Sequence, residues 1–306
     1  MKKLAYSVLG VAALSLFSHG AVALTVTQTT DGTVLRNALV TNPGEFGSIT
    51  ASYAVGNSTQ VGTYSGFNSP PVTIGDGVVM STGHVVDTVG PYNNAVSGGL
   101  VSTDFGGGST PEIEAYSAAH DSNWASGHDA AVLQLDFSLA NPSAIAFNFI
   151  LGSVEYPLYA GYFVDPFHVF LDGAPITFDA LGEPAQLGKN FAAQLRTNDT
   201  NTIFTGVGAN AGNDAHALFD ILTTRSGTLG AGNHTIRFEI ADAYDGQYDS
   251  AVFISDFRLT TNPGAPHTDP IGAVPEPSNA ALLAVGAALI GMALRRRADP
   301  RPIRIA

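Results

Sequence analysis

Apolar and polar residues alternate in several short segments of this chain, and this alternation limits the fold more than any other feature. In residues 131–138, Leu133, Leu135 and Phe137 share one face, while polar side chains occupy the other. The same pattern recurs in residues 145–151, 167–172, 235–240 and 251–259. A period of two is typical of β-strands that pack on a core from one side. The sequence therefore predicts an all-β fold, an antiparallel β-sandwich of jelly-roll-like form.

Between residues 24 and 261, helical signals are confined to two short segments. Residues 31–40 have Asp31 as an N-cap and apolar residues spaced four apart, which is typical of a helix with one buried face. Residues 110–120 have Thr110 as an N-cap and Pro111 at the first helical position, where proline is favoured. We expect one or two short helices beside the sandwich.

The N-terminal segment has the three parts of a secretory signal peptide. Lys2 and Lys3 precede an apolar run at 4–17, and the small-residue pattern Ala-Val-Ala follows at 21–23. The run is short for a membrane span, and the small residues mark a cleavage site. We expect signal peptidase to remove residues 1–23 during export, leaving an N-terminal apolar helix only in the precursor.

A second apolar segment, residues 280–294, lies near the C-terminus and is followed by an arginine cluster at 295–297. Its 15 residues would form a helix of about 22 Å, against a hydrocarbon core of roughly 30 Å. The arginines would hold that end on the cytoplasmic side. The sequence therefore predicts a helix that anchors the chain transiently in the inner membrane. A Pro- and Gly-rich linker at 262–273 separates this signal from a domain at 24–261.

Residues 274–306 resemble a PEP-CTERM sorting signal. The resemblance rests on a Pro-Glu-Pro motif, an apolar helix and an arginine cluster, with the motif residues Pro275, Glu276, Pro277, Arg295, Arg296 and Arg297. Proteins with this signal resemble substrates of exosortases in Gram-negative bacteria. The resemblance implies cutting near the Pro-Glu-Pro by an exosortase-type enzyme and delivery to the cell surface or the extracellular space. The tail after the arginine cluster is longer than is usual for this signal.

The segment between the two signals is strongly acidic, and the chain contains no cysteine. Residues 24–275 hold 24 acidic residues (26 without Glu276 and Asp299) and 6 of the 13 basic ones, so their net charge is about −18. This charge repels phosphate backbones, so we expect no nucleic-acid partner, and it attracts divalent cations. Without disulfides, stability must come from the core, and an oxygen-ligated ion such as Ca²⁺ is a candidate for additional stabilisation.

Residues 242–250, with the sequence DAYDGQYDS, hold Asp242, Asp245 and Asp249 around a glycine. Positions 3 and 5 counted from Asp242 are tyrosine and glycine, so the spacing is not that of an EF-hand loop. The segment follows one predicted strand and precedes another, and we expect it to be the rim of a hairpin. Two interpretations remain. It is a solvated turn whose aspartates cap backbone N–H groups, or it is part of a cation site.

Residues 153–172 hold Glu155 and Asp165 among the aromatic residues Tyr156, Tyr159, Tyr162, Phe163, Phe167 and Phe170. Carboxylates among aromatic rings occur in glycosidase acid/base pairs and on platforms that stack against sugars. They also occur in structural and ion-binding roles, and the sequence separation does not decide between these. A calcium-stabilised fold would take ligands from both acidic regions, namely Glu155, Asp165, Asp242, Asp245 and Asp249.

Most of the domain resembles the choice-of-anchor L domain. The resemblance rests on five motifs in family order: GDGVVMSTGHV (75–85), DAAVLQLDFS (129–138), FNFILGSVEY (147–156), FVDPFHVFLDG (163–173) and IADAYDGQYDSAVFIS (240–255). Val154 and Val164 replace polar residues of the family pattern. The acids that match it are Glu155, Asp165, Asp242 and Asp249. The resemblance implies an exported surface protein and no defined chemistry.

The chain contains neither a G-x-S-x-G nor an H-E-x-x-H motif, which are signatures of hydrolases and zinc proteases. We therefore expect a non-enzymatic, adhesin-like or structural module of the cell surface or extracellular matrix, with exopolysaccharide as a candidate partner. The alternative is a carbohydrate-binding module, or a hydrolase acting on polysaccharide that uses Glu155 and a second carboxylate.

Overall fold

The structure is a computed structural model that describes residues 23–67, 74–90, 101–120, 124–155, 165–176, 195–196, 202–204, 217–219, 221–264 and 267–270. Residues 1–22 of the predicted signal peptide, the whole sorting signal at 274–306 and the aromatic residues at 156–163 lie outside the described residues. Part of the predicted linker does so as well. Within the described part of the chain, no helix is long and apolar enough to cross a membrane.

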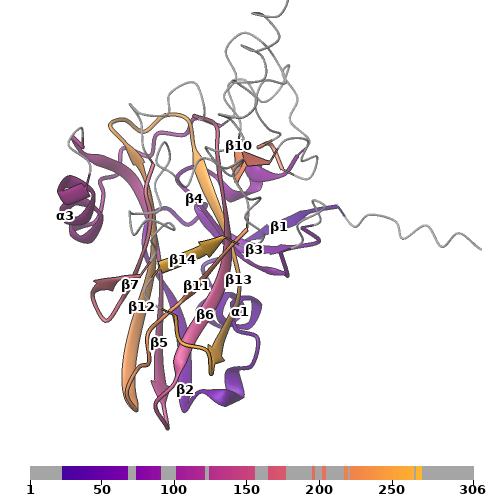
Figure 1. Cartoon of the computed structure of the whole chain (residues 1–306). Coiled ribbons are helices and arrows are strands. Elements are labelled where there is room, and N and C mark those ends of the chain that lie inside the picture. Colours follow the sequence, from indigo (N-terminus) through magenta and orange to yellow (C-terminus); the bar gives the residue numbers. More distant parts are fainter. Residues whose placement is uncertain are drawn as a thin grey trace, which may run out of the picture.

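Two antiparallel sheets pack face to face (Figure 1). The smaller sheet has the order β2–β5–β12–β7–β8. Its strands are β2 (Ser48–Val55), β5 (Gly127–Leu139), β12 (Gly232–Ala243), β7 (Phe167–Leu171) and β8 (Ala174–Pro175). The apolar rows of β5, β7 and β12 point into the main core. The predicted antiparallel β-sandwich is confirmed.

The larger sheet has the order β1–β3–β4–β13–β6–β10–β9, and β11 pairs with both β6 and β14. Its strands are β1 (Thr25–Gln28), β3 (Val61–Ser65), β4 (Gly77–Ser81), β13 (Ser250–Thr260), β6 (Ala144–Ser153), β10 (Ala217–Phe219), β9 (Leu195–Arg196), β11 (Leu222–Arg225) and β14 (His267–Pro270). β14 falls inside the stretch predicted as a linker, so part of that stretch pairs with the sheet.

The five segments with alternating residues are all strands, namely β5, β6, β7, β12 and β13. β6 and β13 are buried on both faces. Their inward side chains join the main core, while Ile150 and Phe253 point outward into a second apolar cluster with Tyr64 and Phe204. Because this cluster covers the outer face of the larger sheet, its central strands lack a solvent-facing polar row.

Both predicted helices are present. α1 (Gly32–Leu39) begins after Asp31, whose carboxylate accepts from the N–H groups of Thr33 and Val34 at 2.8 and 3.2 Å. Leu35 and Leu39 are buried in the main core. Two short 3₁₀ helices, η1 (Pro43–Glu45) and η2 (Val85–Thr88), follow later in the chain.

The second helix, α3 (Pro111–His120), begins after Thr110, whose hydroxyl accepts from the N–H of Ile113 at 3.1 Å. α3 lies against the outer face of the smaller sheet (Figure 1), where Ile113 packs with Ala130 and Ala241. The layers therefore run from α3 through the smaller sheet, the main core and the larger sheet to the second apolar cluster.

The prediction of a hairpin around residues 242–250 is wrong. β12 pairs with β5 and β7, whereas β13 pairs with β4 and β6. The two strands belong to different sheets, and residues 244–249 cross from one sheet to the other. Each strand already has neighbours along both edges, so neither has a free edge with which to pair with the other.

Candidate functional site

Five acidic side chains are buried at one end of the sandwich, and we call them the acidic cluster: Asp129, Glu155, Asp165, Asp242 and Asp249. None is more than 2% exposed. Each lies within two residues of the start or end of a strand, namely β5, β6, β7, β12 and β13 respectively. The pairing register brings these ends together, because Ser250 pairs with Ser153 and Asp242 pairs with His128.

The alternation of the strands directs these carboxylates inward. In β12, Phe238 and Ile240 lie in the main core, and Asp242 is the next residue on the same face. The core-facing rows of β6 and β7 continue in the same way to Glu155 and Asp165. In all three strands, the core-facing row of apolar side chains thus ends in a carboxylate, and the three carboxylates lie at the same end of the sandwich.

Asp165 connects the two sheets. One of its carboxylate oxygens accepts from the N–H of Ala243, at the end of β12, at 2.9 Å. The other accepts from the hydroxyl of Ser250, at the start of β13, at 2.5 Å. These donors lie at the two ends of the crossing segment, so Asp165 fixes where the chain leaves one sheet and enters the other.

Asp249 and Asp129 hold the segment at 101–107 over the cluster. Oδ1 of Asp249 accepts from the N–H of Thr103 at 2.8 Å. The two oxygens of Asp129 accept from the N–H groups of Phe105 and Gly107 at 2.9 and 2.8 Å. Backbone N–H groups of Asp249 and Asp129 also donate to the carbonyls of Val101 and Gly107, at 2.9 and 3.3 Å. The carboxylates add charge-assisted hydrogen bonds, which are stronger than neutral ones.

Four carboxylate oxygens of the cluster are buried and have no hydrogen-bond partner within the described part of the chain. They are Oδ1 and Oδ2 of Asp242, Oε2 of Glu155 and Oδ2 of Asp249. The Thr82 hydroxyl attracts the Asp242 carboxylate, but the pair does not meet hydrogen-bond geometry. That hydroxyl instead donates to the carbonyl of Ser250 at 3.4 Å, and it accepts from the N–H of the same residue at 2.9 Å. Unpartnered buried polar atoms are rare in folded proteins and call for an explanation.

Burial raises the pKa of each member of the cluster. For Asp242 the next causes are the charges of Asp165 and Asp249, and for Glu155 they are the charges of Asp165 and Asp242. Burial raises the pKa of Asp249 to about 7, although hydrogen bonds from Thr103 oppose this. Carboxylates that repel each other in a buried space are stable only when they share protons or meet a cation.

The structure brings together four of the five candidate cation ligands. Asp245, the fifth, is partly exposed, and its Oδ1 accepts from the N–H of Gln247 at 3.1 Å. The solvated-turn interpretation therefore suits Asp245, and it is wrong for the buried Asp242 and Asp249. Among the described residues, no three His, Asp or Glu side chains form a ready group around a single ion position.

Asp129 is the member that the sequence reasoning missed. It lies at the start of β5, where the register with β12 shifts between Ile240 and Asp242. Its φ of 47° is in the left-handed region, which aspartate adopts more readily than most residues. One signal in the sequence could have identified it. Asp129 comes just before the alternating apolar residues of β5, as Asp165 comes just before those of β7.

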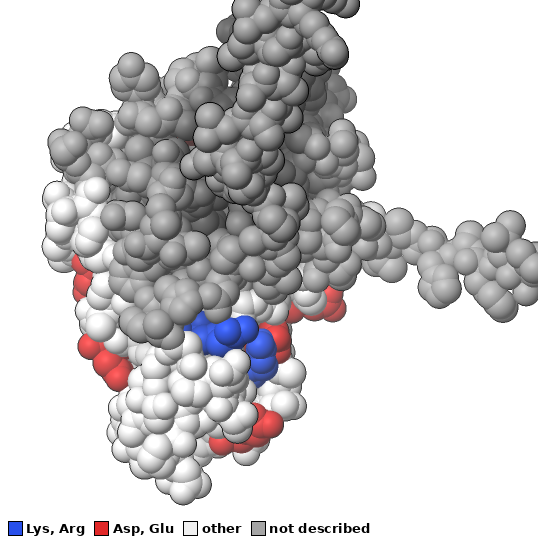
Figure 2. Space-filling model, in the orientation of Figure 1, with Lys and Arg blue, Asp and Glu red and all other residues white. Residues whose placement is uncertain are grey.

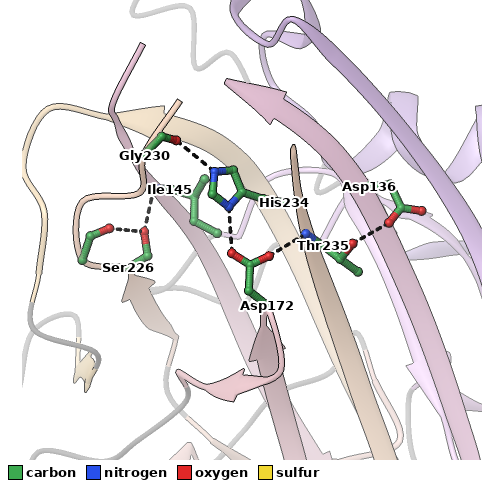
Figure 3. A network of polar contacts seen from close by, with 8 residues as sticks. Asp136, Ile145, Asp172, Ser226, Gly230, His234 and Thr235 are labelled. Atoms are coloured by element: carbon green, nitrogen blue, oxygen red, sulfur yellow. Dashed lines mark hydrogen bonds and ion pairs between the residues drawn. The ribbon is translucent and has the colours of Figure 1, made fainter. Parts of the chain in front are cut away.

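A separate polar network lies near the start of β12 (Figure 3). His234 Nδ1 is 2.7 Å from Asp172, and Nε2 is 2.9 Å from the Gly230 carbonyl. Burial opposes the charged ring, but the hydrogen bonds from His234 to Asp172 and Gly230 outweigh it and raise the pKa of His234. Both ring nitrogens face acceptors, and Ser226 directs its hydroxyl to the carbonyl of Gly227 at 2.8 Å. This histidine–aspartate pair is therefore not arranged to activate a serine nucleophile.

The sequence model described as the choice-of-anchor L domain matches residues 23–258 of this chain. No curated protein matches the chain, and no solved structure matches it. The matched range covers the whole smaller sheet, the larger sheet except β14 and the last two residues of β13, and all five members of the acidic cluster.

Proposed function

Because the chain belongs to the choice-of-anchor L domain family, a family of surface-associated proteins, we propose that it is an adhesin-like or structural module of the bacterial cell surface or extracellular matrix, without enzymatic activity. The observation that carries this proposal is the family match over residues 23–258, which include nearly all of the two sheets. In this proposal, signal peptidase removes the N-terminal segment. An exosortase-type enzyme then cuts near the Pro-Glu-Pro motif and releases the domain from the inner membrane.

The described surface is consistent with an exported, acidic module. On the face shown in Figure 2, acidic side chains appear at several separate places, and one small group of basic side chains lies next to one of them. The predicted mature charge of about −18 favours solubility and discourages contact with nucleic acids. Neutral or cation-bridged exopolysaccharide is the partner class that best suits this charge.

A hydrolase that uses Glu155 is less well supported by the geometry. Glu155 and Asp165 are each 1% exposed, whereas a glycosidase pair flanks a sugar chain that must enter between the two carboxylates. Asp165 is also bound by Ala243 and Ser250. We therefore propose that these carboxylates have a structural or ion-binding role.

The sorting part of the proposal can be tested in a Gram-negative host that carries an exosortase-type enzyme. The full chain should lose its C-terminal segment and reach the medium or the outer surface, as followed by mass spectrometry and cell fractionation. A variant with Pro275, Glu276 and Pro277 all replaced by alanine should stay uncut in the inner membrane. Pro302→Ala, beyond the arginine cluster, is the matched control and should behave as the unmodified chain. Equal release of the triple variant would contradict the proposal.

The non-enzymatic part needs a separate measurement. The exported protein should co-sediment with exopolysaccharide from the same host without shortening it, as measured by reducing-end release. Release of reducing ends that Glu155→Gln abolishes would instead establish the hydrolase.

A further inference from the structure

We propose that the acidic cluster binds a calcium ion through the free oxygens of Asp242, Asp249 and Glu155. These are the residues whose buried carboxylate oxygens lack a hydrogen-bond partner in the described part of the chain. Calcium takes roughly 6–8 oxygen ligands, many of them carboxylate, and tolerates irregular geometry. The site would lie where the ends of β6, β12 and β13 meet.

Asp242 carries the argument furthest. It is fully buried, and both of its oxygens are unpartnered. It continues the core-facing row of Phe238 and Ile240. An apolar side chain at this position would pack in the core without burying a charge. A buried carboxylate without donors is among the most unfavourable groups in a protein. A cation that neutralises it provides the missing partner.

The basic side chains described in the structure do not provide that partner. The ion pairs between described residues involve Asp172, Glu112, Glu239 and Asp256, all outside the acidic cluster. The backbone also leaves little space around Asp249, since a Cβ added at Gly83 would lie 1.7 Å from its Oδ2. Asp249 therefore lies closer to the backbone at position 83 than any residue there other than glycine would allow.

The other members of the cluster explain what the ion would stabilise. Asp165 already joins the ends of β12 and β13, and Asp249 and Asp129 hold the segment at 101–107. An ion shared by Asp242, Asp249 and Glu155 would add a link between the two sheets and this covering segment. It would take the place of a disulfide in an exported chain without cysteine. Since the described side chains do not already form a three-ligand group, binding must draw the free oxygens closer together.

Calcium is favoured over magnesium for two reasons. The candidate ligands are carboxylates of the protein, which come from three separate strand ends and leave little place for a shell of ordered water. Magnesium demands near-octahedral geometry and keeps several waters, while calcium accepts irregular sites rich in protein oxygens. The test therefore compares the two ions directly.

The experiment measures thermal unfolding of the exported protein in EDTA, in CaCl₂ and in MgCl₂, together with the heat of calcium binding. At about 100-fold excess over Kd, calcium should raise the unfolding midpoint by about 5–10 °C, with one ion bound per chain. Asp242→Asn should lose both the heat and the shift, and its midpoint in EDTA should equal or exceed that of the unmodified protein because a buried charge is gone. Glu45→Gln removes one charge from an exposed site and is the matched control, which should keep the full response.

A second readout guards against a variant that does not fold. Terbium, a hard cation that replaces calcium, should give luminescence in the unmodified protein that calcium quenches competitively, and Glu155→Gln should weaken this signal at least tenfold in affinity. The proposal is overturned if calcium leaves the midpoint of the unmodified protein unchanged, or if Asp242→Asn keeps the calcium response. It is also overturned if magnesium produces the larger shift. None of these results depends on how the chain is sorted, so the proposed function and this inference can fail independently.

Discussion

His168 allows the packing of α3 on the sandwich to be tested through its proton. It lies on the outer face of β7, fully buried beneath α3. Its Nε2 is 3.3 Å from the Ser117 hydroxyl, and the Tyr116 ring contacts it edge-on with centroids 4.8 Å apart. Burial, followed by the charge of His120, lowers the pKa of His168 to about 3. The folded protein therefore holds this ring neutral.

The sign and size of the effect follow from linkage. A histidine whose pKa is depressed on folding contributes fully above its unfolded pKa of ~6.5, and that contribution falls as the pH drops toward the folded value. Between about pH 7.5 and about pH 5 the loss is roughly 2 kcal/mol, with a limiting slope of about 1.4 kcal/mol per pH unit. His168→Gln cannot titrate, so its free energy of unfolding should lack this loss. As the pH falls from about 7.5 to about 5, the free energy of unfolding of the variant should therefore rise by about 2 kcal/mol relative to that of the unmodified protein.

The assay is urea unfolding of both proteins at several pH values. The variant has its own packing cost, which does not change with pH, so the pH dependence of the difference reports the linkage alone. His168→Phe, a second variant that cannot titrate, should give the same slope despite a different packing cost. A difference that stays constant from about pH 7.5 to about pH 5 would refute the buried neutral histidine, and with it the tight seating of α3.

Further substitutions test other parts of the fold by urea unfolding. Thr110→Ala removes both the cap of α3 and a 2.5 Å hydrogen bond to the buried Glu239. It should lower the free energy of unfolding by about 2 kcal/mol. Thr110→Ser keeps the hydroxyl and should retain most of that stability. Gly77→Ala places a Cβ 2.0 Å from a backbone oxygen of β13 and should abolish soluble folded protein, while Gly75→Ala, with no atom within 4 Å, should fold normally. His234→Gln should be most destabilising below about pH 6.5 and progressively less so as the pH rises through the raised pKa of His234, because that pKa reflects a cation stabilised by folding. A flat pH profile for this variant, or equal yields of the two glycine variants, would contradict the interpretation.

The strand segments could be predicted because their signal is local. A side chain in a strand alternates between faces whatever its neighbours are, so the rows in β5, β7 and β12 are visible in the sequence alone. The helix starts at Asp31 and Thr110 could be predicted for the same reason, since a cap acts within three residues. These features need no knowledge of which strands pair.

Strand pairing is where the prediction was wrong. Closeness in sequence favoured a hairpin between β12 and β13, but burial on both faces of β13 and neighbours along both edges of β12 place them in different sheets. The second apolar cluster also follows from tertiary structure, because Tyr64, Ile150 and Phe204 come from distant segments. Pairing energies depend on such long-range contacts, which a single sequence does not display.

The sequence by itself determined the class of the molecule: strands of period two, two capped helices, an acidic chain without cysteine and the motifs of its family. It also supplied Glu155, Asp165, Asp242 and Asp249 as candidates. Only the tertiary structure decided that these acids, with Asp129, are buried together instead of lying in a solvated turn. The physical reason is that burial and repulsion arise from the meeting of strand ends far apart in the chain, and that meeting is set by sheet register.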